Sequence, residues 1–326
     1  MNAILCFGEA LIDFHAQAST DPRLPPTFVP HAGGAPANVA VGIARLGGQA
    51  TFIGMLASDM FGDLLLGQLR EAGVDVGHVV RTDAANTALA FVSHAADGER
   101  SFSFYRPPAA DLLFRAAHFD DAAFADAAAF HACSNSLTEA AIAEVTVHGM
   151  TRARAGGALV SFDMNLRPAL WPRGEDPGPR LWRALAEADL IKLSAEELAF
   201  LATAPGSERR VIERLWQGHA RLLIVTDGAQ SMRWFTPTHR GSLPAFPVRA
   251  IDTTGAGDAF VAGLLYRLVR EGVGAGALTT LAEDQGRRDD MLRFAAACGA
   301  LAVTHAGSFA AMPTQEAVHS FLRNHF

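Results

Sequence analysis

The feature that most constrains this chain is the regular alternation of short apolar segments with longer segments rich in Ala and Leu. This alternation predicts βαβ units and a mostly parallel sheet. The short segments are apolar almost throughout, as expected where helices cover both faces of a sheet. We predict strands at residues 3–9, 50–54, 130–134, 159–164, 190–194 and 222–228.

Helices are predicted from the longer segments. They cover residues 35–47, 62–73, 137–155, 178–188, 195–203, 207–218, 257–271, 291–304 and 314–324. Residues 22–30 and 168–179 are rich in proline and are predicted to be loops, because proline sustains neither a helix interior nor a central strand.

Two segments, residues 12–33 and 87–106, interrupt this alternation. Both are predicted to be extended, and the second contains a turn signal at Ala96-Asp97-Gly98 that is typical of a β-hairpin. We therefore predict a small β-sheet that lies as a lid over a single α/β domain of residues 1–326.

The composition narrows the class of protein. The chain has 326 residues and a formal net charge of −7, so it offers no basic excess for nucleic acid. No stretch reaches the ~18 apolar residues of a membrane span. Glu9 and Asp13 interrupt the first apolar run, which indicates a strand and not a signal peptide. The three cysteines are far apart, which argues against disulfides or zinc and is typical of the cytoplasm.

Lys192 is the only lysine in the chain. A Walker A loop needs a Gly-Lys-Ser/Thr sequence and a protein kinase needs a strand lysine, and IKLSAEEL around Lys192 matches neither. The glycine-rich run at 272–277 follows a helix and not a strand, so it predicts an interhelix loop and not a dinucleotide site. Phosphate transfer by this chain would need a different phosphate-binding motif.

The strongest motif is DTTGAGD, from Asp252 to Asp258, at the start of a predicted helix. Backbone N–H groups at a helix start have no intrahelical partner, and the helix dipole adds partial positive charge. Gly255 and Gly257 allow close approach to a ligand, so the motif predicts an anion hole for a phosphoryl group. Asp258 is placed to accept a proton from an attacking alcohol. The alternative is a glycine turn whose aspartate only stabilises the helix.

A second motif lies near the N-terminus, where Gly33 and Gly34 precede a predicted helix that carries Asn38 in its first turns. The glycines allow a ligand to approach the backbone, and the Asn38 amide offers both a donor and an acceptor. This combination suits a polyol. Ordinary turn chemistry ahead of an amphipathic helix is the alternative.

Together the two motifs resemble, in the right order, the two signatures of the ribokinase-like (PfkB) carbohydrate kinases. The resemblance covers nearly the whole chain and is strongest to the bacterial fructokinases, through GEALIDF, GER-x-F-x-FYR and the segment at 163–171. It implies a Rossmann-like, mostly parallel sheet flanked by helices, with a small β-sheet lid that closes over the sugar. It also implies ATP and Mg²⁺ as cofactors, K⁺ as an additional cation, and a homodimer formed through the lid.

The resemblance assigns roles to individual residues. Asp258 corresponds to the catalytic base, and Gly255, Ala256 and Gly257 correspond to the anion hole. The positions expected to contact the sugar or its phosphate are Asp13, Gly33, Gly34, Asn38, Arg106 and Arg167. The positions expected to bind the nucleotide are Ser194, Thr226, Gly228 and Ala229. The positions expected near cations are Glu197, through waters of Mg²⁺, and Asp252, Thr254 and Gly307, beside K⁺.

The lid residues bear on the choice of sugar. We place Phe91 and Phe104 on the face towards the sugar and Tyr105 on the other face of its strand. Because phenylalanine offers no hydrogen bond to a carboxylate, this arrangement favours a neutral ketohexose. The resemblance then implies D-fructose, phosphorylated on its 6-hydroxyl. The alternatives within the family are ribose, aminoimidazole riboside and 2-keto-3-deoxygluconate.

Two further classes of protein are weighed against a kinase. A non-catalytic sugar-binding regulator on the same fold would be expected to lack Asp258 or the anion-hole glycines, which are present. A nicotinamide oxidoreductase would need G-x-G-x-x-G after the first strand, and EALIDF follows it instead.

Overall fold

The computed structural model describes residues 3–17, 23, 25–94, 100–203, 206–281 and 283–325. A large sheet lies at its centre, in the order β14-β13-β12-β11-β10-β9-β1-β4. The strands from β12 to β4 pair in parallel, and β13 and β14 add an antiparallel edge. Its strands are β1 (Ala3–Phe7), β4 (Ala50–Ile53), β9 (Ala127–Cys133), β10 (Leu159–Asp163), β11 (Leu190–Ser194), β12 (Leu222–Thr226), β13 (Met232–Phe235) and β14 (Arg240–Leu243). The predicted α/β fold with a mostly parallel sheet is confirmed.

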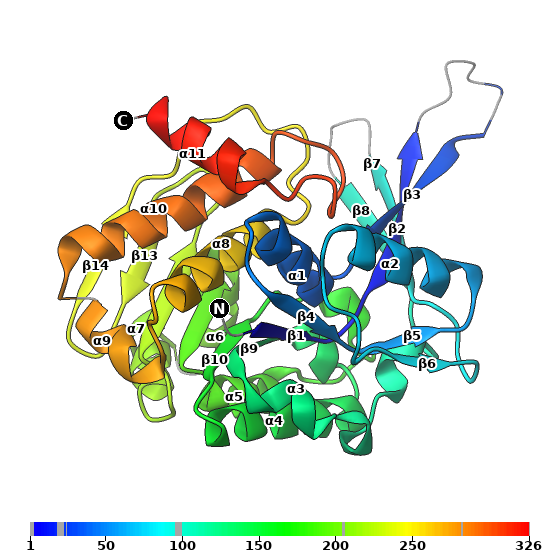
Figure 1. Ribbon diagram of the computed structural model, residues 1–326, viewed down its shortest axis with the longest axis horizontal. Coiled ribbons are helices and arrows are strands. Elements are labelled where there is room, and N and C mark those ends of the chain that lie inside the picture. The colour runs from blue at the N-terminus through cyan, green and yellow to red at the C-terminus, as the bar shows by residue number, and fades with distance from the viewer. Residues whose placement is uncertain are drawn as a thin grey trace.

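Helices cover both faces of the large sheet (Figure 1). One core lies between the sheet and α1, α8 and α10, and a second lies between the sheet and α4 to α7. The helices are α1 (Ala35–Arg45), α2 (Met60–Glu71), α3 (Asp121–Ala125), α4 (Ala140–Ala155), α5 (Gly178–Glu187), α6 (Ala195–Ala202), α7 (Glu208–Leu215), α8 (Ala256–Arg270), α9 (Leu278–Leu281), α10 (Gln285–Ala302) and α11 (Gln315–Arg323).

Burial explains why these segments adopt these elements. β10 is buried at every position, as expected for a central strand covered on both faces. In α5 the buried residues are Leu181, Ala184 and Leu185, whose spacing places them on one stripe of a surface helix.

The two segments that interrupt the alternation form a smaller sheet in the order β3-β2-β7-β8. It projects from the large sheet at the upper right of Figure 1. Its strands are β2 (Leu11–Gln17), β3 (Thr27–Gly33), β7 (Leu89–His94) and β8 (Arg100–Tyr105). The predicted turn at residues 96–98 lies outside the described residues. Residues 27–30 belong to β3 and not to a loop; Pro30 is tolerated because β3 is an edge strand.

Several short elements were not predicted. They are β5 (Met55–Ala57) with β6 (Val80–Thr82), and the antiparallel pair β13 and β14. In addition, α10 begins at Gln285, ahead of the predicted residue 291, with Asp284 as its N-cap. Within the part of the chain that is described, no helix combines the length and apolar character needed to cross a membrane.

Candidate active site

The predicted anion hole lies at the start of α8. Gly255 is the N-cap of this helix, with φ at 75°, a left-handed conformation that favours glycine. No side chain caps the helix, so no side chain competes with a ligand for the amides at its start, and the Ala256 amide makes a long bond of 3.4 Å to the Thr253 carbonyl. Asp258 lies in that first turn and is buried. A helix start that combines open amides with a carboxylate suits an attacking hydroxyl and a transferred phosphoryl group.

Asn38 lies directly beside this carboxylate. Its Nδ2 donates to Asp258 Oδ2 over 2.7 Å, which orients the carboxylate. Its Oδ1 is buried and makes no hydrogen bond among the described residues. A buried acceptor without a partner is costly, and a bound hydroxyl would satisfy it. Asn38, predicted to contact the sugar directly, therefore also positions Asp258.

Two carboxylates from distant parts of the chain face the same space. Burial raises the pKa of Asp258 to about 6. Burial and then the charge of Asp258 raise the pKa of Asp13, on β2, to about 7. Gly33 lies against Asp13, because a Cβ at residue 33 would come within 2.4 Å of Asp13 Oδ2. The arrangement offers hydrogen-bond acceptors to sugar hydroxyls on one side and a base on the other.

Two further predicted residues border this space. Gly34, with φ at 105°, is the N-cap of α1 and sets the turn that presents Asn38. Arg167 is exposed on the loop after β10, and its positive charge lowers the pKa of both Asp13 and Asp258. The arginine therefore lies close enough to act on the charges of the site.

The predicted nucleotide residues lie at the carboxyl ends of β11 and β12, where open parallel sheets bind ligands. Ser194 caps α6 and accepts a hydrogen bond from the Glu197 amide over 3.1 Å. Thr226 ends β12, and the exposed residues Gly228 and Ala229 follow it in a turn. These residues form one rim of the site.

Glu197 links two loops of this rim. Its two carboxylate oxygens accept hydrogen bonds from the amides of Leu166 and Ser194, both at 2.7 Å. Burial and the charge of Asp163 raise its pKa. Glu197 thus fixes the loop that carries Arg167 to the start of α6.

The residues predicted to lie beside a K⁺ ion are brought together. Asp252 Oδ1 accepts from the Thr254 amide over 2.8 Å, and its Oδ2 accepts from the Gly307 amide over 3.1 Å. Asp252 thereby ties the loop before α8 to the loop after α10.

Arg106 is buried and ion-paired, and its contact with the sugar or phosphate stays a prediction. Its side chain is 2% exposed, and its Nε and Nη2 both donate to Asp111 Oδ2, the first over 2.9 Å. Its Nη1 donates to Thr138 over 3.3 Å. Because a carboxylate five residues further along the chain neutralises it, Arg106 fastens the end of β8 to the unit built on the large sheet.

The assignment of Phe91 to the face towards the site is wrong. Ala90 is paired with Asp13 on one side and with Phe104 on the other, so these three side chains share the face towards the site. Phe91 points to the opposite face, where it contacts Tyr105 at a ring distance of 5.4 Å. The sequence pattern lacked the register of β7 against β8, and a shift of one residue exchanges the faces.

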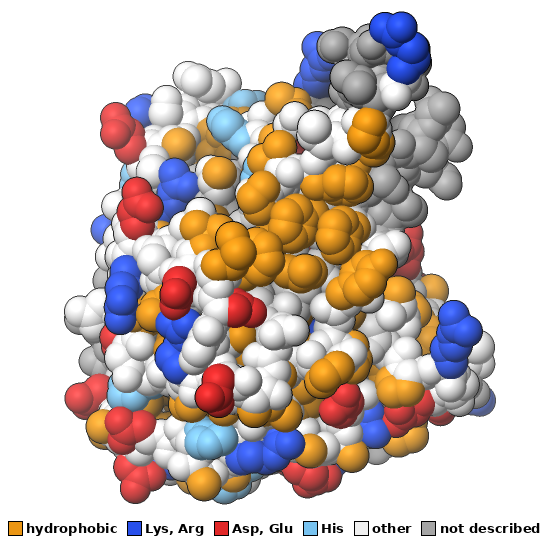
Figure 2. All heavy atoms as spheres, turned by 90° about the vertical axis from the view of Figure 1, so that its right-hand side faces the viewer, with side chains coloured by type: hydrophobic (Ala, Val, Ile, Leu, Met, Phe, Trp, Pro, Cys, Tyr) orange, Lys and Arg blue, Asp and Glu red, His pale blue; other side chains and the backbone are white. Residues whose placement is uncertain are grey.

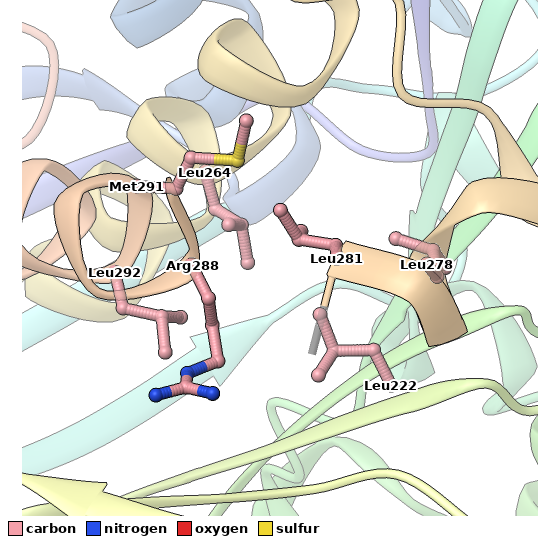
Figure 3. Close-up of a pocket in the computed structure, with 7 residues that line it drawn as sticks. All are labelled: Leu222, Leu264, Leu278, Leu281, Arg288, Met291 and Leu292. Atoms are coloured by element: carbon pink, nitrogen blue, oxygen red, sulfur yellow. The ribbon is translucent and has the colours of Figure 1, made fainter. Parts of the chain in front are cut away.

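A separate cavity lies at the other end of β12. Its volume is about 10 Å³, which holds at most one water. Figure 3 shows the side chains that line it, which are Leu222, Leu264, Leu278, Leu281, Arg288, Met291 and Leu292. Its apolar walls and small volume leave no room for a sugar or a nucleotide there.

Comparison with known proteins agrees with this geometry. Residues 1–315 match the family described as pfkB family carbohydrate kinase. The chain is 56% identical to a fructokinase from Xylella fastidiosa solved with bound ATP, which superposes with a TM-score of 0.94 over 99% of this chain and 98% of that one. It is 42% identical to Fructokinase-1 of Oryza sativa subsp. japonica over 96% of this chain and 95% of the relative. A double mutant of the fructokinase from Vibrio cholerae O395, solved with fructose, ADP and a potassium ion, is 32% identical, with a TM-score of 0.85 over 99% and 98% of the two chains.

Proposed function

Because the chain belongs to the pfkB family of carbohydrate kinases, we propose that it transfers the γ-phosphoryl group of ATP to D-fructose, forming fructose 6-phosphate. The observation that carries this proposal is the pairing of Asp258 with the open amides at the start of α8. Asn38 orients that carboxylate at 2.7 Å, and Asp13 faces it from the small sheet. One side of the site thus suits a sugar and the other a phosphoryl group.

In this mechanism Asp258 accepts the proton of the sugar hydroxyl as its oxygen attacks the γ-phosphorus. The bond between that phosphorus and the bridging oxygen breaks, and ADP leaves. The amides of Gly255, Ala256 and Gly257 stabilise the charge on the transferred group. Arg167 adds positive charge from the exposed rim of the site.

Fructose is held by the small sheet and the turn that precedes α1. The carboxylate of Asp13 and the unpaired Oδ1 of Asn38 accept hydrogen bonds from its hydroxyls. Gly33 and Gly34 let the sugar approach the backbone, and Phe104 packs over its carbon face. The small sheet acts as the lid.

A neutral sugar fits this site better than an acid. The sheet face that carries Asp13 presents Ala90 and Phe104, neither of which has a hydroxyl. Arg106 is already neutralised by Asp111, and two carboxylates face the sugar. A keto-acid would meet this negative charge with Arg167 as its main counter-charge, which disfavours 2-keto-3-deoxygluconate.

ATP lies along the rim made by Ser194, Thr226, Gly228 and Ala229. Carboxylate oxygens suit Mg²⁺, and Glu197 would hold it through water. When bound, Mg²⁺ supplies neutralising charge to the phosphates. Asp252 and the backbone around Thr254 and Gly307 offer oxygen donors, which suit K⁺ beside the anion hole.

The enzyme acts as a homodimer in the cytoplasm. On the side of the molecule seen in Figure 2, hydrophobic side chains gather over α2 and the small sheet. Phe28, Met60, Leu64 and Tyr105 are exposed there, by 37% to 74%. A patch of this kind marks an interaction surface, and a second copy of the lid would cover it. The buried free thiols of Cys6, Cys133 and Cys298 suit a reducing compartment.

The test is an assay of ADP release with the purified protein and four acceptors, D-fructose, D-ribose, aminoimidazole riboside and 2-keto-3-deoxygluconate. We expect the highest kcat/KM for D-fructose, with fructose 6-phosphate as product. A preference for the keto-acid or the riboside would assign the chain to another activity of the family. Sugar binding by calorimetry without ADP release from any of the four would indicate a regulator.

A further inference from the structure

The only lysine of the chain is buried beside the candidate active site. Lys192 lies near the carboxyl end of β11, and its Nζ is 3.1 Å from each carboxylate oxygen of Asp163, at the end of β10. Both side chains are at most 10% exposed. Among the described residues, these are the hydrogen bonds that Lys192 Nζ makes.

The ammonium group reaches the first turn of α8. A Cβ at Gly257 would lie 2.9 Å from Lys192 Nζ and 3.9 Å from Asp163 Oδ2. A side chain at residue 257 would therefore displace the lysine head, which occupies that space. The positive charge lies alongside the amides that face the phosphoryl group.

Several carboxylates surround this one cation. Burial lowers the pKa of Lys192, but Asp163, Glu197 and Asp258 outweigh it, so the pKa is raised and the side chain stays charged. Conversely, the charge of Lys192 lowers the pKa of Asp258. A triphosphate that enters a site containing three carboxylates needs cations close to its transferred group.

A purely structural ion pair accounts poorly for this position. A buried pair stabilises a fold weakly, because desolvation offsets most of the attraction. Arginine supplies every other cationic Lys or Arg side chain of the chain, and the one lysine lies here. A lysine head is compact and has three N–H donors, whereas the guanidinium group of arginine is larger and planar.

We propose that Lys192 is a catalytic residue that donates a hydrogen bond to an oxygen of the γ-phosphoryl group while Asp163 holds it in place. This inference rests on the proposed kinase function. As the sugar oxygen bonds to phosphorus and ADP departs with the electron pair of the broken bond, the hydroxyl proton passes to Asp258. Lys192 transfers no proton and remains an ammonium ion, so it stabilises the charge on the phosphoryl group throughout.

The first test needs no mutation, because a single lysine gives a single side-chain signal. Protein labelled with ¹³C at lysine Cε is titrated with Mg-ADP and with a non-hydrolysable Mg-ATP analogue, each in the presence of fructose. We expect the signal to move further with the ATP analogue than with ADP. Equal shifts with both nucleotides would mean that Lys192 does not sense the γ-phosphoryl group, and would overturn the proposal.

The second test is kinetic. Lys192→Met is expected to lower kcat roughly 10²–10³-fold, as when one donor to the developing charge is removed, with a small change in the KM for fructose. The control is Arg154→Met, which breaks the Arg154–Asp189 pair of 2.8 Å at the opposite end of β11. This control should lower stability and leave kcat unchanged.

The outcomes separate the two proposals. A Lys192→Met enzyme with wild-type kcat and a loss of thermal stability like that of Arg154→Met would make Lys192 only a structural partner of Asp163. If Lys192→Met does not fold, the nucleotide titration of the labelled wild-type protein still tests the proposal. Absence of ADP release from the wild-type protein with any sugar would instead reject the kinase function itself.

Discussion

At the scale of single residues, Asp258 is the group on which the proposed chemistry depends. Asp258→Asn keeps the shape of the side chain and removes its capacity to accept a proton. We expect kcat to fall by roughly 10²–10⁴-fold, with little change in the binding of fructose measured by calorimetry.

The matched control is Asp289→Asn. Asp289 is as buried as Asp258, at 8% exposure, but it pairs with Arg288 on α10. The Asp289→Asn variant should lose some thermal stability and keep the turnover of the wild-type enzyme. Wild-type turnover in the Asp258 variant would remove that residue from the role of base.

The raised pKa values of Asp13 and Asp258 predict a pH dependence of activity. Because the base must be ionised, kcat/KM for fructose should fall as the pH drops through about 6 to 7, the pKa range of the pair. Asp13→Asn removes a negative neighbour, so it should move the midpoint of this fall to lower pH. A midpoint near pH 4 in the wild-type enzyme would contradict the raised pKa values of the two carboxylates.

The same groups predict the pH dependence of stability. The folded pKa of Asp13 is about 7, above its ordinary value of 3.8, so the folded state binds the proton more tightly than the unfolded state. This contribution to the free energy of unfolding is fully present below pH 3.8 and is lost as the pH rises through 7. Thermal melts of the ligand-free protein should show the slope, and Asp13→Asn should flatten it.

At the scale of elements, the start of α8 explains why residue 257 is glycine. Gly257→Val would drive a branched side chain into Lys192 Nζ, 2.9 Å from the position of its Cβ. We expect phosphoryl transfer to collapse while fructose still binds by calorimetry. Gly276→Val is the control, since no atom lies within 4 Å of a Cβ there. Normal turnover of the Gly257 variant would place the phosphoryl group elsewhere.

The sequence predicted the elements that follow strong periodic patterns. The apolar runs of β10 and β12 and the glycine-rich start of α8 are local signals, and each was found within a few residues of its position. β13 and β14 escaped prediction because they are short, with four residues each, and lie at a sheet edge where apolar and exposed positions mix.

What the sequence could not supply was pairing between distant segments. The faces of Phe91 and Phe104 depend on the register across β7 and β8, which no local pattern encodes. The pairing of Arg106 with Asp111 was not predicted, because nothing in the sequence shows that Asp111 turns back towards the arginine. Lys192 stood out as the only lysine, but its place beside Gly257 depends on how the start of α8 lies relative to β11, which no local pattern encodes.

At the scale of the whole molecule, the candidate site lies between the small sheet and the larger unit built on the large sheet. Asp13 belongs to the small sheet, and Asp258 and the anion hole belong to the large unit. Asp111 holds the end of β8 to the large unit through Arg106, so the small sheet is anchored at its base. A sugar bound between the two bodies would contact both, which suits a lid that closes on its substrate.

The face of the small sheet that points away from the site predicts that the molecule forms a dimer. Phe91 stacks on Phe14 at a ring distance of 5.1 Å and contacts Phe28 and Tyr105, so a continuous aromatic surface faces away from the site. Tyr105 is 67% exposed. We expect the wild-type protein to sediment as a dimer and Tyr105→Asp to sediment as a monomer, because a charge on this surface would be desolvated on association.

Phe200→Asp is the control for this substitution. Phe200 is also an exposed aromatic residue, at 39%, but it lies on α6, away from the small sheet, so its variant should remain a dimer. The lid of a monomer would lose the support of its partner, and we therefore expect the KM for fructose to rise in the Tyr105 variant. A wild-type protein that sediments as a monomer at micromolar concentration would leave the aromatic surface facing solvent and would reject the dimer.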